Sequence, residues 1–155
     1  MLIEVRTILL AEDNPKDVEL TLEALSEHNL ANQVTVVKDG VEAMEYLRRE
    51  GKFQLRSPGN PAVFLLDIKM PRMDGLEVLR AVREDAALKM LPVVILTSSR
   101  EEQDLIRSYE LGVNAYVVKP VDFSDFIQAV KELGVFWAVI NEPPPEGESS
   151  HGATG

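Results

Sequence analysis

The chain has 155 residues, 45% of them hydrophobic, which is enough for the core of one domain and too short for two large ones. Its 16 basic and 26 acidic residues give a formal net charge of −10, which opposes non-specific binding to nucleic acid. The sequence contains no cysteine, which excludes disulfides, zinc-thiolate sites and cysteine nucleophiles. No stretch approaches the roughly 20 apolar residues of a membrane span, so we expect a soluble, cytoplasmic protein without membrane or nucleic-acid partners.

Five short apolar or β-branched runs alternate with five helical patterns along the chain. The runs predict strands near residues 7–11, 33–37, 63–67, 93–97 and 115–118. Strands that alternate with helices favour an α/β fold, in which helices cover both faces of a parallel sheet.

Each helical pattern follows a side chain that commonly caps helices. The predicted caps are Asn14, Asp39, Asp74, Ser99 and Asp122, with Pro15, Glu42, Glu77, Glu102 and Asp125 in the first turns. Apolar residues then recur at helical spacing and are expected to face the sheet: Val18, Leu22 and Leu25; Val41, Met44 and Leu47; Leu76, Leu79 and Val82; Leu105, Ile106 and Tyr109; Phe126, Val130 and Leu133.

Two segments depart from this alternation. Residues 51–62 are long and rich in turn formers, which is typical of either a mobile surface loop or a binding loop. Residues 141–155 contain a proline run and small polar residues that cannot bury apolar surface. We therefore expect one domain over residues 1–140 and a disordered tail after it.

Chemically reactive side chains follow four of the predicted strands. Asp67 ends the third strand, Glu12 and Asp13 follow the first, Thr97 ends the fourth and Lys119 follows the fifth. Open α/β sheets bind their ligands at the carboxyl ends of the strands. We therefore expect these five side chains to gather at one edge of the sheet.

This set of groups suits phosphoryl chemistry that depends on magnesium. Mg²⁺ prefers oxygen ligands and keeps several waters, so Asp13 and Asp67 can bind it while Glu12 binds directly or holds a bound water. An aspartate can itself accept a phosphoryl group as a nucleophile. Lys119 would then balance phosphoryl charge, and the hydroxyl of Thr97 would donate to a phosphoryl oxygen.

Taken singly, these residues have simpler explanations. An aspartate at a strand end is commonly a helix cap or a turn former, and Lys119 with Pro120 alone marks only a turn. Their arrival in chain order at successive strand ends is what favours a functional site.

The chain resembles the receiver domains of two-component response regulators over residues 6 to about 134. The motifs that carry the resemblance are Leu10–Asn14, Leu65–Pro71, Met73–Gly75, Val94–Ser98 and Val118–Pro120. The resemblance implies a flavodoxin-like (βα)5 fold, a doubly wound parallel sheet with strand order 2-1-3-4-5.

The resemblance also implies a role for each site residue. Asp67 would accept a phosphoryl group from a histidine kinase or a phosphotransfer protein. Mg²⁺ would bind Glu12, Asp13, Asp67 and the backbone carbonyl of Lys69; Thr97 and Lys119 would contact the phosphoryl group; Tyr116 would be the switch aromatic; and the Lys119–Pro120 peptide bond would be cis. Such a protein is a phosphorelay switch whose own chemistry is limited to self-phosphorylation and slow autodephosphorylation. With no effector domain expected after residue 140, its output would be protein association.

A narrower resemblance is to the single-domain regulators paired with bacterial phytochromes. It rests on residues 108–116 and 120–123, on Phe136 and Trp137, and on the long loop before the third strand. Phe136 and Trp137 either finish the last helix against the core or, with Tyr109 and Tyr116, extend the face of a homodimer.

Two other functions are open to such a set of residues. A haloacid-dehalogenase-like phosphatase also uses a strand-end aspartate with Mg²⁺, but Lys69 stands where those enzymes carry a second acid. A pseudo-receiver would act as a constitutive scaffold, and such proteins usually lack one of the pocket residues.

Overall fold

The computed structural model describes residues 7–27, 30, 33–108, 111–113 and 115–140. In chain order the elements are β1 (Ile8–Ala11), α1 (Pro15–Ser26), β2 (Val34–Val37), α2 (Gly40–Arg48), the short 3-10 helix η2 (Gly51–Phe53), β3 (Val63–Asp67), α3 (Gly75–Glu84), β4 (Val93–Thr97), α4 (Arg100–Ser108), β5 (Tyr116–Val118), α5 (Phe123–Glu132) and α6 (Phe136–Val139). The strands form one parallel sheet in the order β2-β1-β3-β4-β5, which confirms the predicted fold and strand order.

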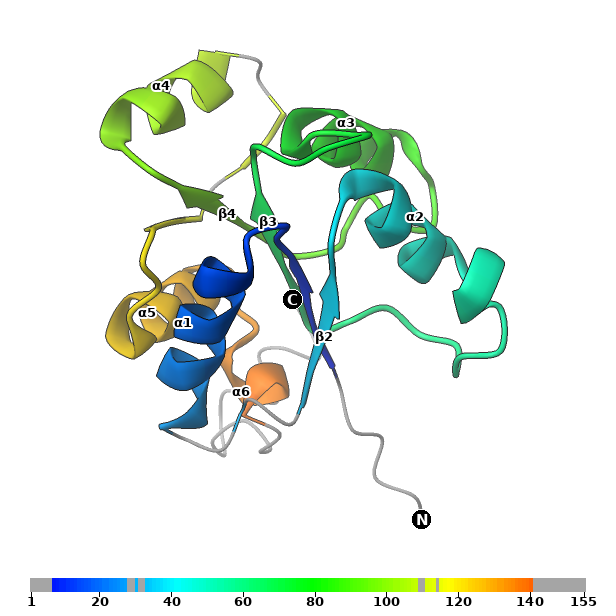
Figure 1. Ribbon diagram of the computed structural model, residues 1–155, viewed down its shortest axis with the longest axis horizontal. Coiled ribbons are helices and arrows are strands. Elements are labelled where there is room, and N and C mark those ends of the chain that lie inside the picture. The colour runs from blue at the N-terminus through cyan, green and yellow to red at the C-terminus, as the bar shows by residue number, and fades with distance from the viewer. Residues whose placement is uncertain (1–6, 28–29, 31–32, 109–110, 114, 141–155) are drawn as a thin grey trace, which may run out of the picture.

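Helices cover both faces of the sheet, with α1 and α5 on one side and α2 and α3 on the other (Figure 1). Successive side chains of a strand point to opposite faces. In β1, Leu9 and Ala11 pack with α2 and α3, whereas Ile8 and Leu10 pack with α1 and α5. Burial on both faces explains why the central strands β1, β3 and β4 read as continuous apolar runs rather than as alternating ones.

All five predicted caps are confirmed. Each capping side chain accepts a hydrogen bond from a backbone N–H in the first turn of its helix: Asn14 from Lys16 and Asp17, Asp39 from Glu42, Asp74 from Glu77, Ser99 from Glu102, and Asp122 from Ser124 and Asp125. Each of the five capped helices, α1 to α5, thus begins in the connection that follows a strand.

The prediction of which α4 residues face the sheet is wrong at one position. Ile106 is buried against the sheet, but the Leu105 side chain is 55% exposed. Consecutive residues of a helix point about 100° apart, so both could not face the sheet equally. Tyr109, the third member of that predicted face, lies outside the described residues.

The segment between α2 and β3 is bonded closely to α2. The Arg56 guanidinium donates to the carbonyls of Tyr46, Leu47, Ser57 and Gly59. It also lies 4.3 Å from the Tyr46 ring centroid. These contacts attach Arg56 to the end of α2 and to the segment that follows it.

Helix α5 ends before Phe136 and Trp137, so these two residues do not belong to it. α5 stops at Glu132, and Gly134 has φ 75°, a left-handed conformation that glycine adopts readily. Phe136 then begins α6 and packs, half-buried, beside the core on the α1 and α5 side. The core interpretation is therefore favoured for Phe136, whereas the side chain of Trp137 and the whole of 141–155 lie outside what the structure describes.

Among the described residues, no helix is long and apolar enough to cross a membrane.

Candidate functional site

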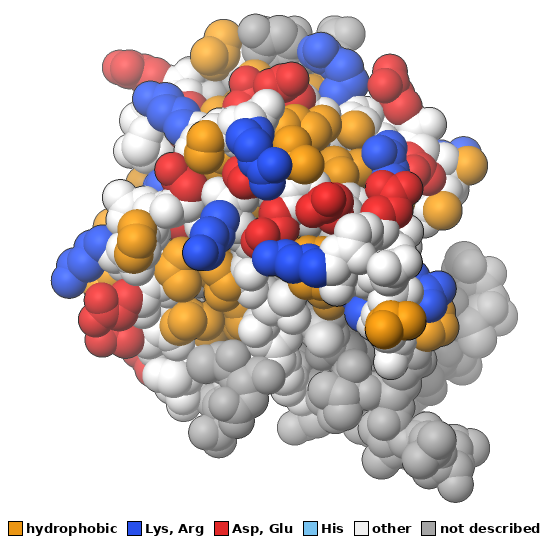
Figure 2. All heavy atoms as spheres, turned by 45° about the vertical axis from the view of Figure 1, so that its right-hand side comes forward, with side chains coloured by type: hydrophobic (Ala, Val, Ile, Leu, Met, Phe, Trp, Pro, Cys, Tyr) orange, Lys and Arg blue, Asp and Glu red, His pale blue; other side chains and the backbone are white. Residues whose placement is uncertain are grey.

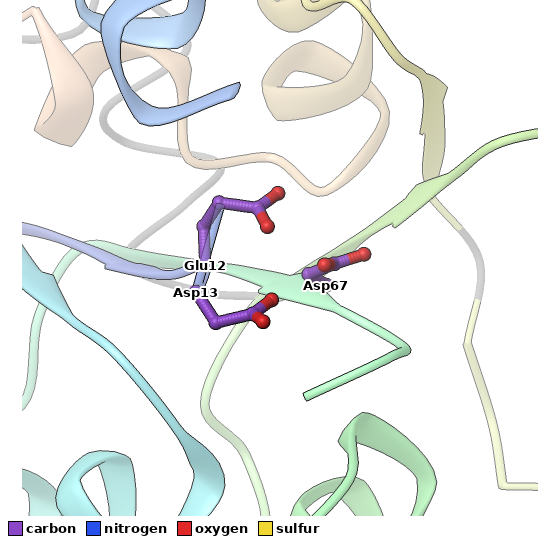
Figure 3. Close-up of side chains that lie close together, drawn as sticks. All are labelled: Glu12, Asp13 and Asp67. Atoms are coloured by element: carbon purple, nitrogen blue, oxygen red, sulfur yellow. The ribbon is translucent and has the colours of Figure 1, made fainter. Parts of the chain in front are cut away.

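Three carboxylates meet at the carboxyl ends of β1 and β3. Glu12, Asp13 and Asp67 each offer an oxygen, and these oxygens all lie within 4.8 Å of one another (Figure 3). Glu12 and Asp67 are buried, at 1% and 4% exposure, while Asp13 is exposed. The cluster is therefore anchored in the core on one side and open to solvent on the other.

The backbone around Asp67 holds its carboxylate in a defined orientation. The N–H of Ile68 donates to Asp67 Oδ1 at 2.9 Å, and the N–H of Gly75 donates to the Ile68 carbonyl at 2.8 Å. A Cβ atom on residue 75 would lie 2.3 Å from the Asp67 carbonyl oxygen. The glycine is therefore required for α3 to begin so close to the end of β3.

Lys119 is held by three carboxylates. Its Nζ atom lies 3.2 Å from Glu12 Oε1, from Asp67 Oδ1 and from Asp17 Oδ2. The three ammonium donors match these three acceptors. Sequence reasoning missed Asp17, because an acidic residue in the first turn of a helix is already explained by the helix dipole. The Lys119–Pro120 peptide bond is cis, as expected.

The electrostatics of the pocket reflect its excess of acid. Burial, followed by the adjacent Asp67 carboxylate, raises the pKa of Glu12 from 4.5 to about 7. Burial alone would lower the pKa of Lys119, but Asp67 and Glu12 outweigh it and raise that pKa. The lysine is thus firmly charged, while the carboxylates still repel one another and would be relieved by a further cation.

Thr97 and Tyr116 lie on neighbouring strands near the cluster. The Thr97 side chain is fully buried, and its Oγ1 is 3.4 Å from Nε2 of Gln103 on α4, a contact that sequence reasoning missed. The Tyr116 hydroxyl is buried, with no hydrogen-bond partner among the described residues. The Arg107 guanidinium lies 4.9 Å from the centre of the Tyr116 ring. Both side chains thus contact residues of α4.

The residues present fit a hard divalent cation. All three candidate ligands offer carboxylate oxygens, which Mg²⁺ and Mn²⁺ prefer, and the exposed Asp13 leaves room for bound water. Lys69, whose carbonyl is the fourth expected ligand, follows Asp67 by two residues in the same loop. The structure thus brings Glu12, Asp13, Asp67 and Lys119 together at one edge of the sheet.

The family model of the response regulator receiver domain matches residues 8–131. This match covers most of the chain and both acidic strand ends. The chain therefore belongs to the receiver domain family of response regulators, which are signalling proteins that receive phosphoryl groups from histidine kinases.

Within this family the chain is similar to regulators associated with phytochromes. It is 60% identical to the bacteriophytochrome response regulator AtBRR, with a TM-score of 0.84 over 90% of this chain and 99% of that one. It is 42% identical to the phosphorylated cyanobacterial phytochrome response regulator RcpA, with a TM-score of 0.68 over 86% of this chain and 94% of that one. It is also 38% identical to the response regulator Rcp1 of Synechocystis sp., over 85% of this chain and 88% of that protein. A Mn²⁺-bound form of Rcp1 has a TM-score of 0.66 over 86% of this chain and 94% of that one.

Proposed function

We propose that Asp67 is the phosphoacceptor of this receiver and that Glu12, Asp13 and Asp67, with the carbonyl of Lys69, bind Mg²⁺. The observation that carries the proposal is the junction of these carboxylates with Lys119, whose Nζ lies 3.2 Å from Asp67 Oδ1. A buried carboxylate beside a fixed cation and an open metal site is arranged for an incoming phosphoryl group.

In the transfer step, an Asp67 carboxylate oxygen forms a bond to phosphorus as the phosphorus–nitrogen bond of a phosphohistidine breaks. The electron pair of that bond returns to the imidazole of the donor. Mg²⁺, when bound, supplies positive charge that offsets the approach of the phosphate to the acidic cluster. Lys119 is already beside Asp67 and balances the charge of the new aspartyl phosphate.

The phosphorylated protein would signal through α4 and β5. A phosphoryl group adds roughly 1.5 to 2 negative charges and new acceptor oxygens. We expect it to draw the Thr97 hydroxyl away from Gln103, with the Tyr116 ring following into the space that Thr97 leaves. The surface formed by α4, β5 and α5 would then change its affinity for a protein target.

The similarity to AtBRR and RcpA supports a phytochrome histidine kinase as the phosphodonor. We also propose that the protein acts in the cytoplasm. A homodimer formed through the side chains of Tyr109, Tyr116, Phe136 and Trp137 remains a prediction, as does the division of the chain at residue 140. We propose no enzymatic activity for this protein other than self-phosphorylation and slow autodephosphorylation.

Phosphorylation can be tested with acetyl phosphate and Mg²⁺, read by mass spectrometry of the intact protein. The wild type should gain one phosphoryl group, and Asp67→Asn should gain none. Thr97→Ala should still be phosphorylated but respond weakly in partner binding or dimerisation, whereas Lys119→Ala should be impaired in both. An Asp67→Asn variant that is labelled like the wild type would refute the assignment.

Two further measurements test the two alternatives. Steady turnover of a small phosphomonoester would favour a phosphatase, although Lys69 occupies the place of that family's second acid. Retained partner binding by Asp67→Ala would favour a constitutive scaffold. For the histidine-kinase partner, phosphotransfer from a panel of kinases that includes phytochromes is the direct measurement.

A further inference from the structure

An ion pair joins the segment after β2 to the loop after β3. Arg72 Nε lies 2.9 Å from Asp39 Oδ2, and Arg72 Nη2 lies 3.0 Å from Asp39 Oδ1. The guanidinium therefore contacts both carboxylate oxygens, a paired geometry that fixes orientation as well as distance. The Asp39 side chain is only 12% exposed, so one partner is held in the fold.

The order of the strands places this ion pair beside the acidic site. β1 lies between β2 and β3 in the sheet, and Glu12 and Asp13 follow β1. Parallel strands end at the same edge of a sheet, so the segments after β2 and β3 flank the end of β1. The ion pair thus joins the two segments on either side of the strand end that carries two of the three carboxylates.

The backbone of Arg72 shows that its position is imposed. Its φ is 65°, in the left-handed region that residues other than glycine seldom adopt. Such a conformation persists when surrounding contacts determine it. The ion pair with Asp39 is a contact of that kind.

A close contact between Gly40 and the backbone of Met73 also holds the same loop. A Cβ atom on Gly40 would lie 2.1 Å from the Met73 carbonyl oxygen, so only glycine allows the loop to pack there. At its base the loop is closed by the hydrogen bond from Gly75 to Ile68. Residues 68–74, which contain Lys69, are therefore held at the base and at the outer end.

We propose that Asp39 and Arg72 are positioning residues, which hold the 68–74 loop so that Asp67 and the Lys69 carbonyl face the metal position together. This inference rests on the proposed function. Neither side chain is among the residues proposed to bind the metal or to contact the phosphoryl group. Their contribution is to keep the loop from moving away from the end of β1 when the cation binds.

Two substitutions remove the ion pair with little other change. Asp39→Asn keeps an oxygen that can accept the capping hydrogen bond from Glu42, but loses the charge. Arg72→Asn removes the guanidinium, and asparagine tolerates the left-handed backbone. Arg49→Asn is the matched control, because Arg49 also has a left-handed φ, 57°, but caps the far end of α2.

Mg²⁺ affinity of the full chain, measured by calorimetry, is the primary readout. Asp39→Asn and Arg72→Asn should each weaken binding by about threefold, a modest loss because Arg72 is partly exposed. The double variant should bind about as weakly as either single one. The rate of phosphorylation by acetyl phosphate should fall in parallel, and Arg49→Asn should change neither quantity.

The direction of the two effects separates positioning from simple electrostatics. If only local charge mattered, loss of the Arg72 cation would tighten Mg²⁺ binding and loss of the Asp39 anion would weaken it. Opposite effects, unchanged affinities, or losses equal to those of Arg49→Asn would overturn the proposal. A wild type that neither binds Mg²⁺ nor accepts phosphate would instead overturn the proposed function.

Discussion

Glu12 is a carboxyl group whose protonation depends on the fold. Burial, and then Asp67, raise its pKa from 4.5 to about 7, so the folded chain binds this proton more tightly than the unfolded chain does. Its contribution to stability is therefore complete below the unfolded pKa and is lost as the pH rises through the folded one. Near neutral pH the metal-free protein would therefore hold Glu12 only partly ionised.

We predict that the free energy of unfolding of the metal-free protein falls between about pH 5 and about pH 8 by on the order of 1 to 3 kcal/mol through this group. Glu12→Gln should lack this part of the pH dependence, because it cannot ionise. Urea denaturation in the presence of a chelator measures both proteins. If their free energies of unfolding have equal slopes against pH, Glu12 is not the group responsible.

Asp17 is predicted to orient Lys119, because its Oδ2 lies 3.2 Å from Nζ. Asp17→Asn should slow phosphorylation by acetyl phosphate about fivefold, as expected from the loss of a partly exposed ion pair. Glu19→Gln removes the same charge from the same helix and is the control. Equal rates in these two variants would assign the effect of Asp17 to general charge rather than to contact with Lys119.

At the scale of elements, one arginine organises the connection from α2 to β3. Arg56 donates to four backbone carbonyls, while its neighbour Leu55 is 94% exposed. We predict that Arg56→Ala lowers the free energy of unfolding by about 1 to 2 kcal/mol, because those carbonyls lose a charged donor. Leu55→Ala should lie within about 0.5 kcal/mol of the wild type in the same urea titration.

The contrast between these neighbours is diagnostic. If Leu55→Ala is as destabilising as Arg56→Ala, the connection is held by apolar contacts that the hydrogen bonds do not represent. Rapid hydrogen exchange over residues 51–60 in Arg56→Ala, with slow exchange in β3, would locate the loss in the connection itself.

At the scale of the whole molecule, the net charge of −10 is spread over a mixed surface. On the face shown in Figure 2, Lys and Arg side chains lie among Asp and Glu side chains. The buried concentration of acid at the strand ends is therefore a local feature that the overall charge does not reveal. It is also the feature through which a cation can stabilise the fold.

We predict that Mg²⁺ stabilises the protein against unfolding, because the carboxylates gather only in the folded chain. At ten times its dissociation constant, Mg²⁺ should add about 1.4 kcal/mol, by mass action on the native state. Asp13→Asn should abolish most of this gain with little effect on the metal-free protein, since Asp13 is exposed. Thermal denaturation with and without Mg²⁺ is the measurement, and an equal gain in both proteins would place the metal elsewhere.

The sequence by itself determined the sheet, the helix starts and the pocket residues at the strand ends. Apolar runs buried on both faces and capping side chains are local signals, and parallel strands necessarily bring their carboxyl ends to one edge. Leu105 shows the limit of periodicity, because a turn of helix does not reveal which of two adjacent apolar residues faces inward. The sequence shows Gly75 as part of a motif, but it does not show why a glycine is needed there. The reason is the close approach of residue 75 to Asp67.

Only the tertiary structure decided the contacts between residues far apart in the chain. The third partner of Lys119, the hydrogen bond from Gln103 to Thr97 and the ion pair between Asp39 and Arg72 each join different elements. None of these pairs has a spacing that a local pattern could show. Charged side chains on helix starts and loops have adequate local explanations, so only packing of the elements against one another selects their partners.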